Sequence, residues 1–273
     1  MRSIIKYSKL KLRERPESCR PVGPKFSSAG ELSVRLADTQ LSFRAPRHDP
    51  APFGDNQQLK MWKDYPLAVG GKPLNSNVQP SQSWCHTEIF FRQWSFCGPW
   101  FTGYMGRTSC YLEVVELAEP NSRLNFMHPK ALEVASLSYL TANYGHEVID
   151  RDSGEMNYIA PLNWSVVTQL EIPTVQFDSE NTIGSADPER HVFIPISRRH
   201  IAHFSFNTVQ NASGTREEVD KKVDPAPFKE LVDNIVGSIR VTLSPEAQAD
   251  WDEIRKSNPD AKVSETCAPL KWP

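Results

Sequence analysis

The 273-residue sequence predicts an α+β fold in which antiparallel sheets carry helices on their faces. Apolar residues follow the two-residue period of strands over 31–45 and again over 89–117. Over 129–144 and 226–239 they instead recur every three to four positions, as in amphipathic helices. The 22 prolines, against 13 glycines, favour short strands and fixed loops over a helical bundle.

The most aromatic stretch is 89–106, IFFRQWSFCGPWFTGYMG, which holds no acid and only one base. Residues 89–96 alternate with both faces largely apolar, so we expect a central strand covered on both sides. The Cys-Gly-Pro sequence at 97–99 ends this strand, and 108–117 is the next strand of a hairpin. As an alternative, Trp94, Trp100 and Tyr104 line a groove for a ligand or partner.

The other elements are predicted from the same periods and from helix-capping residues. Pro129 begins the first helix and Gly145 ends it, while Asp224 and Ser244 cap two later helices. The predicted strands and helices are a hairpin over 31–45 with its turn at 37–40, a strand at 164–177, a hairpin of 191–196 with 201–209, a short strand at 240–243, and helices at 129–144, 226–239 and 245–258.

Charge and pattern divide the chain into three parts. Residues 1–30 form a basic arm, 31–146 a first α+β lobe, and 147–273 a second lobe, with the boundary at the acidic segment 146–157. Each lobe has strands followed by a helix, which suggests two similar lobes, although no residue-level repeat links them. We expect the lobes to form one compact unit; the sequence does not predict the oligomeric state.

Composition favours a soluble cytoplasmic protein. The net charge is −2, so no global charge favours nucleic acid or a membrane surface. No apolar run of signal-peptide or membrane-span type is present. The five cysteines are widely spaced without a C-x-x-C pair, which indicates reduced thiols and predicts no metal or other cofactor.

Two clusters suggest acid–base chemistry, and a hydrolase is the alternative function. One is His48 beside Asp49, and the other is the group of acids at 178–189. His200 and His203 resemble a metal pair, but residues three apart on a strand point to opposite faces. Cys97 and Cys110 lie in apolar surroundings, which make a thiol unreactive.

The leading expectation is a non-enzymatic protein that binds another protein. No G-x-S-x-G elbow and no phosphate-binding loop occurs in the sequence. Two acidic segments, 147–155 and 178–189, are suited to steering a basic partner. The residues expected at the interface are Asp150, Asp152, Glu155, Asp178 and Glu180 for steering, with Trp94, Trp100 and Tyr104 as aromatic anchors.

Several stretches resemble bacterial proteins encoded beside secreted toxins. They are LSFRAPRHDPAPFGDN at 41–56, WSFCGPWFTG at 94–103, and HPKALEVASLSYL at 128–140 with PLNW at 161–164. The resemblance implies a cytoplasmic immunity protein of a secretion-system pair that binds and occludes its cognate toxin, for which a nuclease is one candidate. The stretch FKELVDNIVGSIRVTLS at 228–244 also resembles part of the PsbP-like α/β/α sandwich, a scaffold with binding roles.

Overall fold

The fold is described from a computed structural model of the chain. The described residues are 18–36, 38–50, 58, 60, 64–65, 83–98, 103–119, 121, 123–145, 157–182 and 188–272. Most of the predicted basic arm therefore lies outside them. Within them, no helix is both long enough and apolar enough to cross a membrane.

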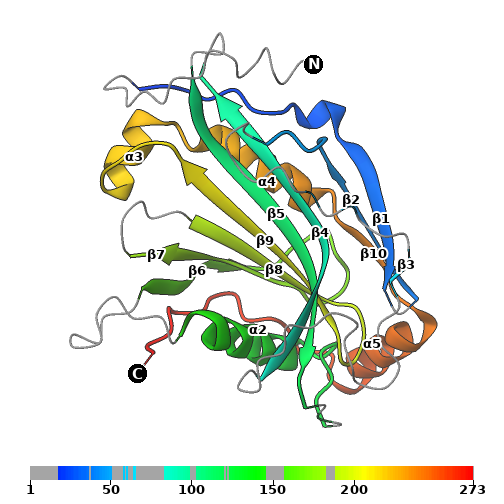
Figure 1. Ribbon diagram of the computed structural model, residues 1–273. Helices are drawn as coiled ribbons and strands as arrows, with labels where there is room; N and C mark the ends of the chain where they lie inside the picture. Colours follow the sequence, from blue (N-terminus) through cyan, green and yellow to red (C-terminus); the bar gives the residue numbers. More distant parts are fainter. Residues whose placement is uncertain are drawn as a thin grey trace.

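Two sheets form the body of the protein (Figure 1). The larger has the order β4-β5-β9-β8-β7-β6, and all its neighbouring strands are antiparallel. Its strands are β4 (Trp84–Cys97), β5 (Tyr104–Leu117), β6 (Tyr158–Ser165), β7 (Val175–Asn181), β8 (Pro188–Pro195) and β9 (Ile201–Gln210). The smaller sheet, β10-β2-β1-β3, consists of β1 (Gly30–Leu36), β2 (Thr39–Ala45), β3 (Asp64–Tyr65) and β10 (Arg240–Thr242), with β3 parallel to β1.

The helices begin where their capping residues predict. They are η1 (Phe26–Ser28), α2 (Pro129–Tyr144), α3 (Arg216–Lys222), α4 (Ala226–Gly237) and α5 (Pro245–Ser257). Asp224 accepts a hydrogen bond from the first backbone N–H of α4, and Ser244 accepts one from the N–H of Ala247 in α5. The sequence reading missed α3, although Thr215 and Glu218 form a capping box at its start.

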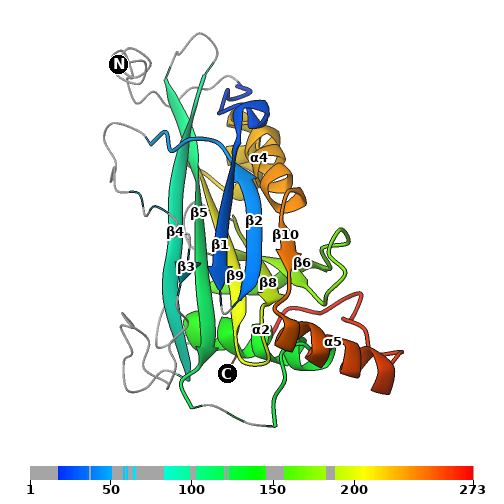
Figure 2. The same cartoon turned by 90° about the vertical axis from the view of Figure 1, so that its right-hand side faces the viewer.

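The two faces of the larger sheet have different cores. Leu112 and Phe204 face the smaller sheet and α4, whereas Val115 and Phe193 face α2 and the C-terminal tail. Figure 2 shows β1, β2 and β10 lying across the larger sheet, with α4 beside them. The predicted α+β fold, with helices packed on sheet faces, is therefore confirmed.

The larger sheet combines strands from both predicted lobes. β5, before residue 147, pairs with β9, after it, from Gly106–Gln210 to Val115–Ile201. Strand β10, near the end of the chain, pairs with β2 near its beginning. The boundary expected near residue 147 thus separates segments that share both sheets.

The prediction of one strand over 164–177 is wrong. Strand β6 ends at Ser165 and β7 begins at Val175. Between them, the Thr174 hydroxyl accepts a hydrogen bond from the Val167 N–H, and Leu170 N–H bonds to the Val167 carbonyl. Residues 166–172, VVTQLEI, mix apolar and polar side chains, and these bonds hold the segment as a turn-rich connection.

Replacing Gly106 in β5 by alanine should lower the free energy of unfolding by about 2–3 kcal/mol. Gly106 has φ +150°, and a Cβ there would meet the Val209 carbonyl and the Phe228 ring. The matched control is Gly237→Ala in α4, where a Cβ meets no atom and alanine favours the helix. Chemical denaturation should show loss of stability for the first variant only; equal midpoints for the two would contradict the close β5–β9 approach.

Candidate functional site

Two of the three aromatic residues predicted as anchors belong to the core instead. Trp94 is fully buried, and its indole N–H donates to the Pro46 carbonyl at 3.2 Å. Tyr104 is also buried, whereas Trp100 lies outside the described residues. Neither Trp94 nor Tyr104 offers a ring to a partner: the face of β4 that carries Trp94 packs against the smaller sheet, and Tyr104 is only 7% exposed.

The acidic residues predicted to steer a partner divide into two groups. Asp150, Asp152 and Glu155 lie outside the described residues. Asp178 is buried, and its carboxylate already accepts hydrogen bonds from within the protein: Arg190 Nε donates to it at 2.7 Å and the Asn163 amide at 2.8 Å. Only Glu180, which is half-buried, keeps partial exposure among the described members. Asp178 is therefore a structural ion-pair residue and no steering charge.

The geometry gives no support to the acids at 178–189 as a catalytic pair. Asp178 lies opposite Arg190, and Glu189 lies opposite Ser179, in the pairing of β7 with β8. Adjacent residues on a strand point to opposite faces, so Asp178 and Glu189 are on different sides of the sheet. Asp187 lies outside the described residues.

His48 and Asp49 extend the edge of β4. The N–H of Gln93 donates to His48 Nδ1 at 3.1 Å, while Asp49 exchanges backbone hydrogen bonds with Gln93 and Ser95. Because the two residues are consecutive in an extended segment, their side chains diverge. This arrangement fixes the segment to the sheet through the Asp49 backbone and the His48 imidazole.

The α2 face of the larger sheet carries a polar site that the sequence reading missed. Strand registers place its side chains in three rows, which cross the sheet from β7 to β4. The rows are Ser179, Glu189, Asn207, Ser109 and Gln93; then Phe177, His191, Ser205, Tyr111 and Phe91; then Val175, Phe193, His203, Glu113 and Glu88. Polar residues thus continue across the face from its covered half to its β4–β5 half.

A hydrogen-bonded chain runs diagonally through these rows. Ser179 Oγ lies 2.9 Å from His191 Nε2, and His191 Nδ1 lies 3.1 Å from His203 Nε2. His203 Nδ1 is 3.4 Å from Glu113 Oε2, which also accepts a hydrogen bond from the Tyr139 hydroxyl at 3.2 Å. With both imidazoles neutral, the Ser179 hydroxyl donates to His191 and His191 donates to His203, whose Nδ1 lies beside the Glu113 carboxylate without a well-aligned hydrogen bond to it.

Burial and hydrogen bonding give the two carboxyl groups opposite pKa shifts. Burial alone would raise the pKa of Glu113, but hydrogen bonding and charge interaction with His203 outweigh burial and lower it. Burial raises the pKa of Glu189, despite a hydrogen bond from the Tyr144 hydroxyl at 2.9 Å. Burial, with His203 nearby, lowers the pKa of His191. His191 is therefore held neutral, and Glu113 ionised, on this face of the sheet.

The hydrogen-bonded side chains include the residue types of a nucleophilic triad, but a substrate could not reach the serine. Ser179 is only 1% exposed, and its strand lies beneath α2. Cys110 is likewise buried, and burial raises the pKa of its thiol. The structure describes all five cysteines and joins no two in a disulfide. The hydrogen-bonded side chains instead orient Glu113, which lies at the edge of the part of the sheet that α2 covers.

On the β4–β5 half of this sheet face, the side chains are acidic or aromatic and partly exposed. Tyr111 is half-buried, and its pKa is raised by burial and then by Glu88, Glu189 and Glu113, with Arg107 acting in the opposite direction. Phe91 stacks on Tyr111 at 4.4 Å between ring centroids. We call Glu88, Phe91, Tyr111, Glu113 and Glu189 the acidic face.

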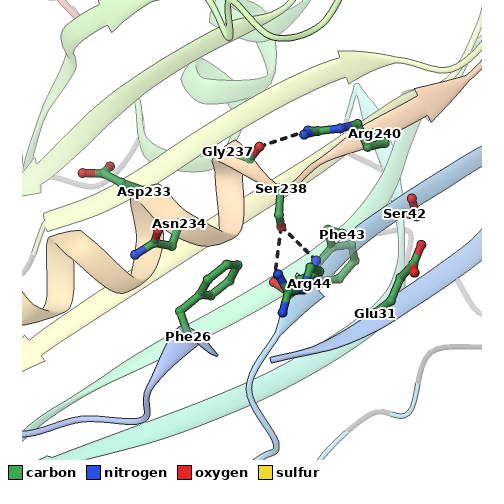
Figure 3. A pocket seen from close by; sticks show the side chains of 10 residues that line it. All are labelled: Phe26, Glu31, Ser42, Phe43, Arg44, Asp233, Asn234, Gly237, Ser238 and Arg240. Carbon is green, nitrogen blue, oxygen red and sulfur yellow. Dashed lines mark hydrogen bonds between the residues drawn. The ribbon is translucent and has the colours of Figure 1, made fainter. Parts of the chain in front are cut away.

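A groove of about 470 Å³ lies on another side of the molecule, where α4 ends against the smaller sheet (Figure 3). Phe26 and Phe43 contribute apolar surface, and the Arg44 guanidinium lies 5.3 Å from the centroid of the Phe26 ring. Ser238 Oγ accepts a hydrogen bond from the Arg44 N–H at 2.8 Å. Bases and acids line this groove together, so it has no dominant charge.

The described residues contain no group of three or more His, Cys, Asp or Glu side chains arranged to hold a metal. His200 and His203 contact different acids, Glu116 at 3.3 Å and Glu113 at 3.4 Å. The candidate site is therefore a carboxylate and aromatic surface supported by a buried histidine chain. Comparisons of the chain with protein-family models, curated proteins and solved structures gave no match.

Proposed function

We propose that the protein is a cytoplasmic immunity protein that binds and occludes a basic cognate toxin. The observation that carries this proposal is the acidic face, where three carboxylates surround the partly exposed ring of Tyr111. Clustered charge of one sign attracts a partner of the opposite sign and increases the rate of association.

Occlusion requires an extended contact and no chemistry by the immunity protein. A stable interface covers roughly 800 Å² on each partner. The acidic face supplies charge and aromatic area together, and aromatic residues are common among those that dominate binding energy. A toxin that acts on nucleic acid presents a basic active surface to its substrate, so an acidic face is complementary to it. The resemblance to proteins encoded beside toxins supports the same function.

The direct test is co-purification with the product of the adjacent gene, together with rescue of cells that express that product. We expect a complex at micromolar concentration whose association rate falls as salt rises. Glu88→Lys, at an exposed position, should slow association about tenfold. The matched control is Glu253→Lys on α5, also exposed and distant in the fold, which should leave the rate unchanged.

Two results would refute the proposal. One is the absence of a complex with the adjacent product together with failure to protect cells from it. The other is a complex whose association rate does not depend on salt or on Glu88. In that case the acidic face would have no part in steering.

A further inference from the structure

We propose that the acidic face contains a receptor for a single arginine side chain of the partner. The receptor consists of the stacked rings of Phe91 and Tyr111, the carboxylates of Glu113 and Glu189, and the buried amide oxygen of Gln93. The identity of the partner rests on the proposed function, but the receptor is defined by the residues of this chain alone.

The rings provide the surface on which a guanidinium can stack. Phe91 and Tyr111 are cross-strand neighbours with an interplanar angle of 29°, and both are partly exposed. A planar cation over such a ring is attracted by the negative face of its π system. Arginine suits this contact better than lysine, because its guanidinium is planar and less strongly hydrated.

The carboxylates are already held in place by the protein. Tyr139 and His203 both contact Oε2 of Glu113, so its Oε1 is available to a ligand. Tyr144 donates to Glu189 from α2. Since these partners fix the carboxylates before binding, less side-chain entropy is lost on forming the charged hydrogen bonds.

Gln93 is an independent indication of a ligand at this place. It is 7% exposed, it lies on the same sheet face as Phe91, and its Nε2 donates to Ser109 at 3.1 Å. Its Oε1 is buried and accepts no hydrogen bond from any described residue. A buried acceptor without a donor is unfavourable, so turning this amide towards an N–H group of a ligand would stabilise it.

Arg107 limits the receptor to one basic side chain. It lies on the same face of β5 as Tyr111, and its positive charge acts on that hydroxyl in opposition to the carboxylates. Its Nε is buried without a hydrogen-bond partner among the described residues. A second cation on this face would meet Arg107, and for this reason the site suits an isolated arginine better than a basic tract.

The receptor can be tested with small peptides and the full chain. We expect acetyl-Gly-Arg-Gly-amide to bind at millimolar concentration and to shift the NMR signals of the Gln93 side-chain amide and of Tyr111. The lysine peptide should bind about tenfold more weakly. The citrulline peptide, which keeps the shape without the charge, should bind more weakly still.

Variants locate the site and control for misfolding. Glu189→Gln and Tyr111→Leu should each weaken binding of the arginine peptide about tenfold. The matched variant Glu253→Gln should leave it unchanged, and each variant is first shown to unfold cooperatively. The receptor is refuted if the three peptides bind alike, if no signal of the acidic face shifts, or if both variants bind as the unchanged protein does.

The peptide and toxin experiments can fail separately. A toxin complex without arginine-peptide binding would leave the immunity function standing and remove the receptor. Peptide binding without a toxin complex would leave the receptor and remove the immunity function. A toxin complex insensitive to Tyr111→Leu, in a protein that binds the peptide, would show that the toxin does not use the receptor.

Discussion

Replacing Phe43 by alanine should lower the free energy of unfolding by about 3–5 kcal/mol. Phe43 lies on β2 and is only 1% exposed. Its ring meets Phe90 edge-on at 5.3 Å and Phe204 edge-on at 5.1 Å, so it connects the smaller sheet to two strands of the larger one. Truncation removes buried apolar area and both aromatic contacts, and it leaves a cavity between the sheets.

Urea denaturation followed by tryptophan fluorescence measures this change. The control is Val134→Ala on α2, where the side chain is 65% exposed and alanine favours a helix, so the expected change is within about 0.5 kcal/mol. If Phe43→Ala unfolded at the same urea concentration as the unchanged protein, the packing of the two sheets through this ring would be wrong.

Local patterns predicted the elements of this fold, because helices and hairpins depend on residues close in sequence. The helix 129–144 and the hairpin 31–45 were predicted within a few residues of their observed ends. The order of strands in the larger sheet was not predicted. It depends on contacts such as β5 with β9, between residues from Gly106–Gln210 to Val115–Ile201 that are far apart in sequence, and no local period specifies them.

The candidate site illustrates the same limit. The alternation of β5 already places Tyr111 and Glu113 on one face, but it does not say which strands lie beside them. Their neighbours His203 and Glu189 come from β9 and β8, and only the strand register brings them together. Trp94 is predicted as an anchor from its aromatic character, but its large apolar area also favours burial, and in the structure it is fully buried.

Lowering the pH below 6.5 should lower the free energy of unfolding through His191, with a slope that approaches about 1.4 kcal/mol per pH unit at most. Burial lowers the pKa of His191 in the folded protein below its ordinary value of 6.5. This group therefore contributes its full stability above pH 6.5, and that stability is lost as the pH falls towards the folded pKa. Protonation would also reverse the donor order between Ser179 and His191, because Nε2 of the imidazolium would then donate to the Ser179 hydroxyl.

The charged and titratable groups around His191 come from every element packed against it. They are His203 on β9, Glu189 on β8, Glu113 and Tyr111 on β5, Tyr139 and Tyr144 on α2, and Tyr158 on β6. Glu189 acts in the opposite direction: its raised pKa makes the folded protein gain stability as the pH falls towards 4.5. Glu113 has a lowered pKa, so its contribution is lost only below pH 4.5.

The contribution of His191 is isolated in a Glu189→Gln background. There, the free energy of unfolding should fall with acidification between pH 6.5 and 4.5, and a further His191→Gln substitution should flatten that dependence. Ser179→Ala is the matched control, because it removes one hydrogen bond to His191 without removing a titrating group. It should lower stability by about 1 kcal/mol at every pH and keep the slope. A slope that survives His191→Gln would mean that another group takes up the proton, and the buried histidine chain would not control acid stability.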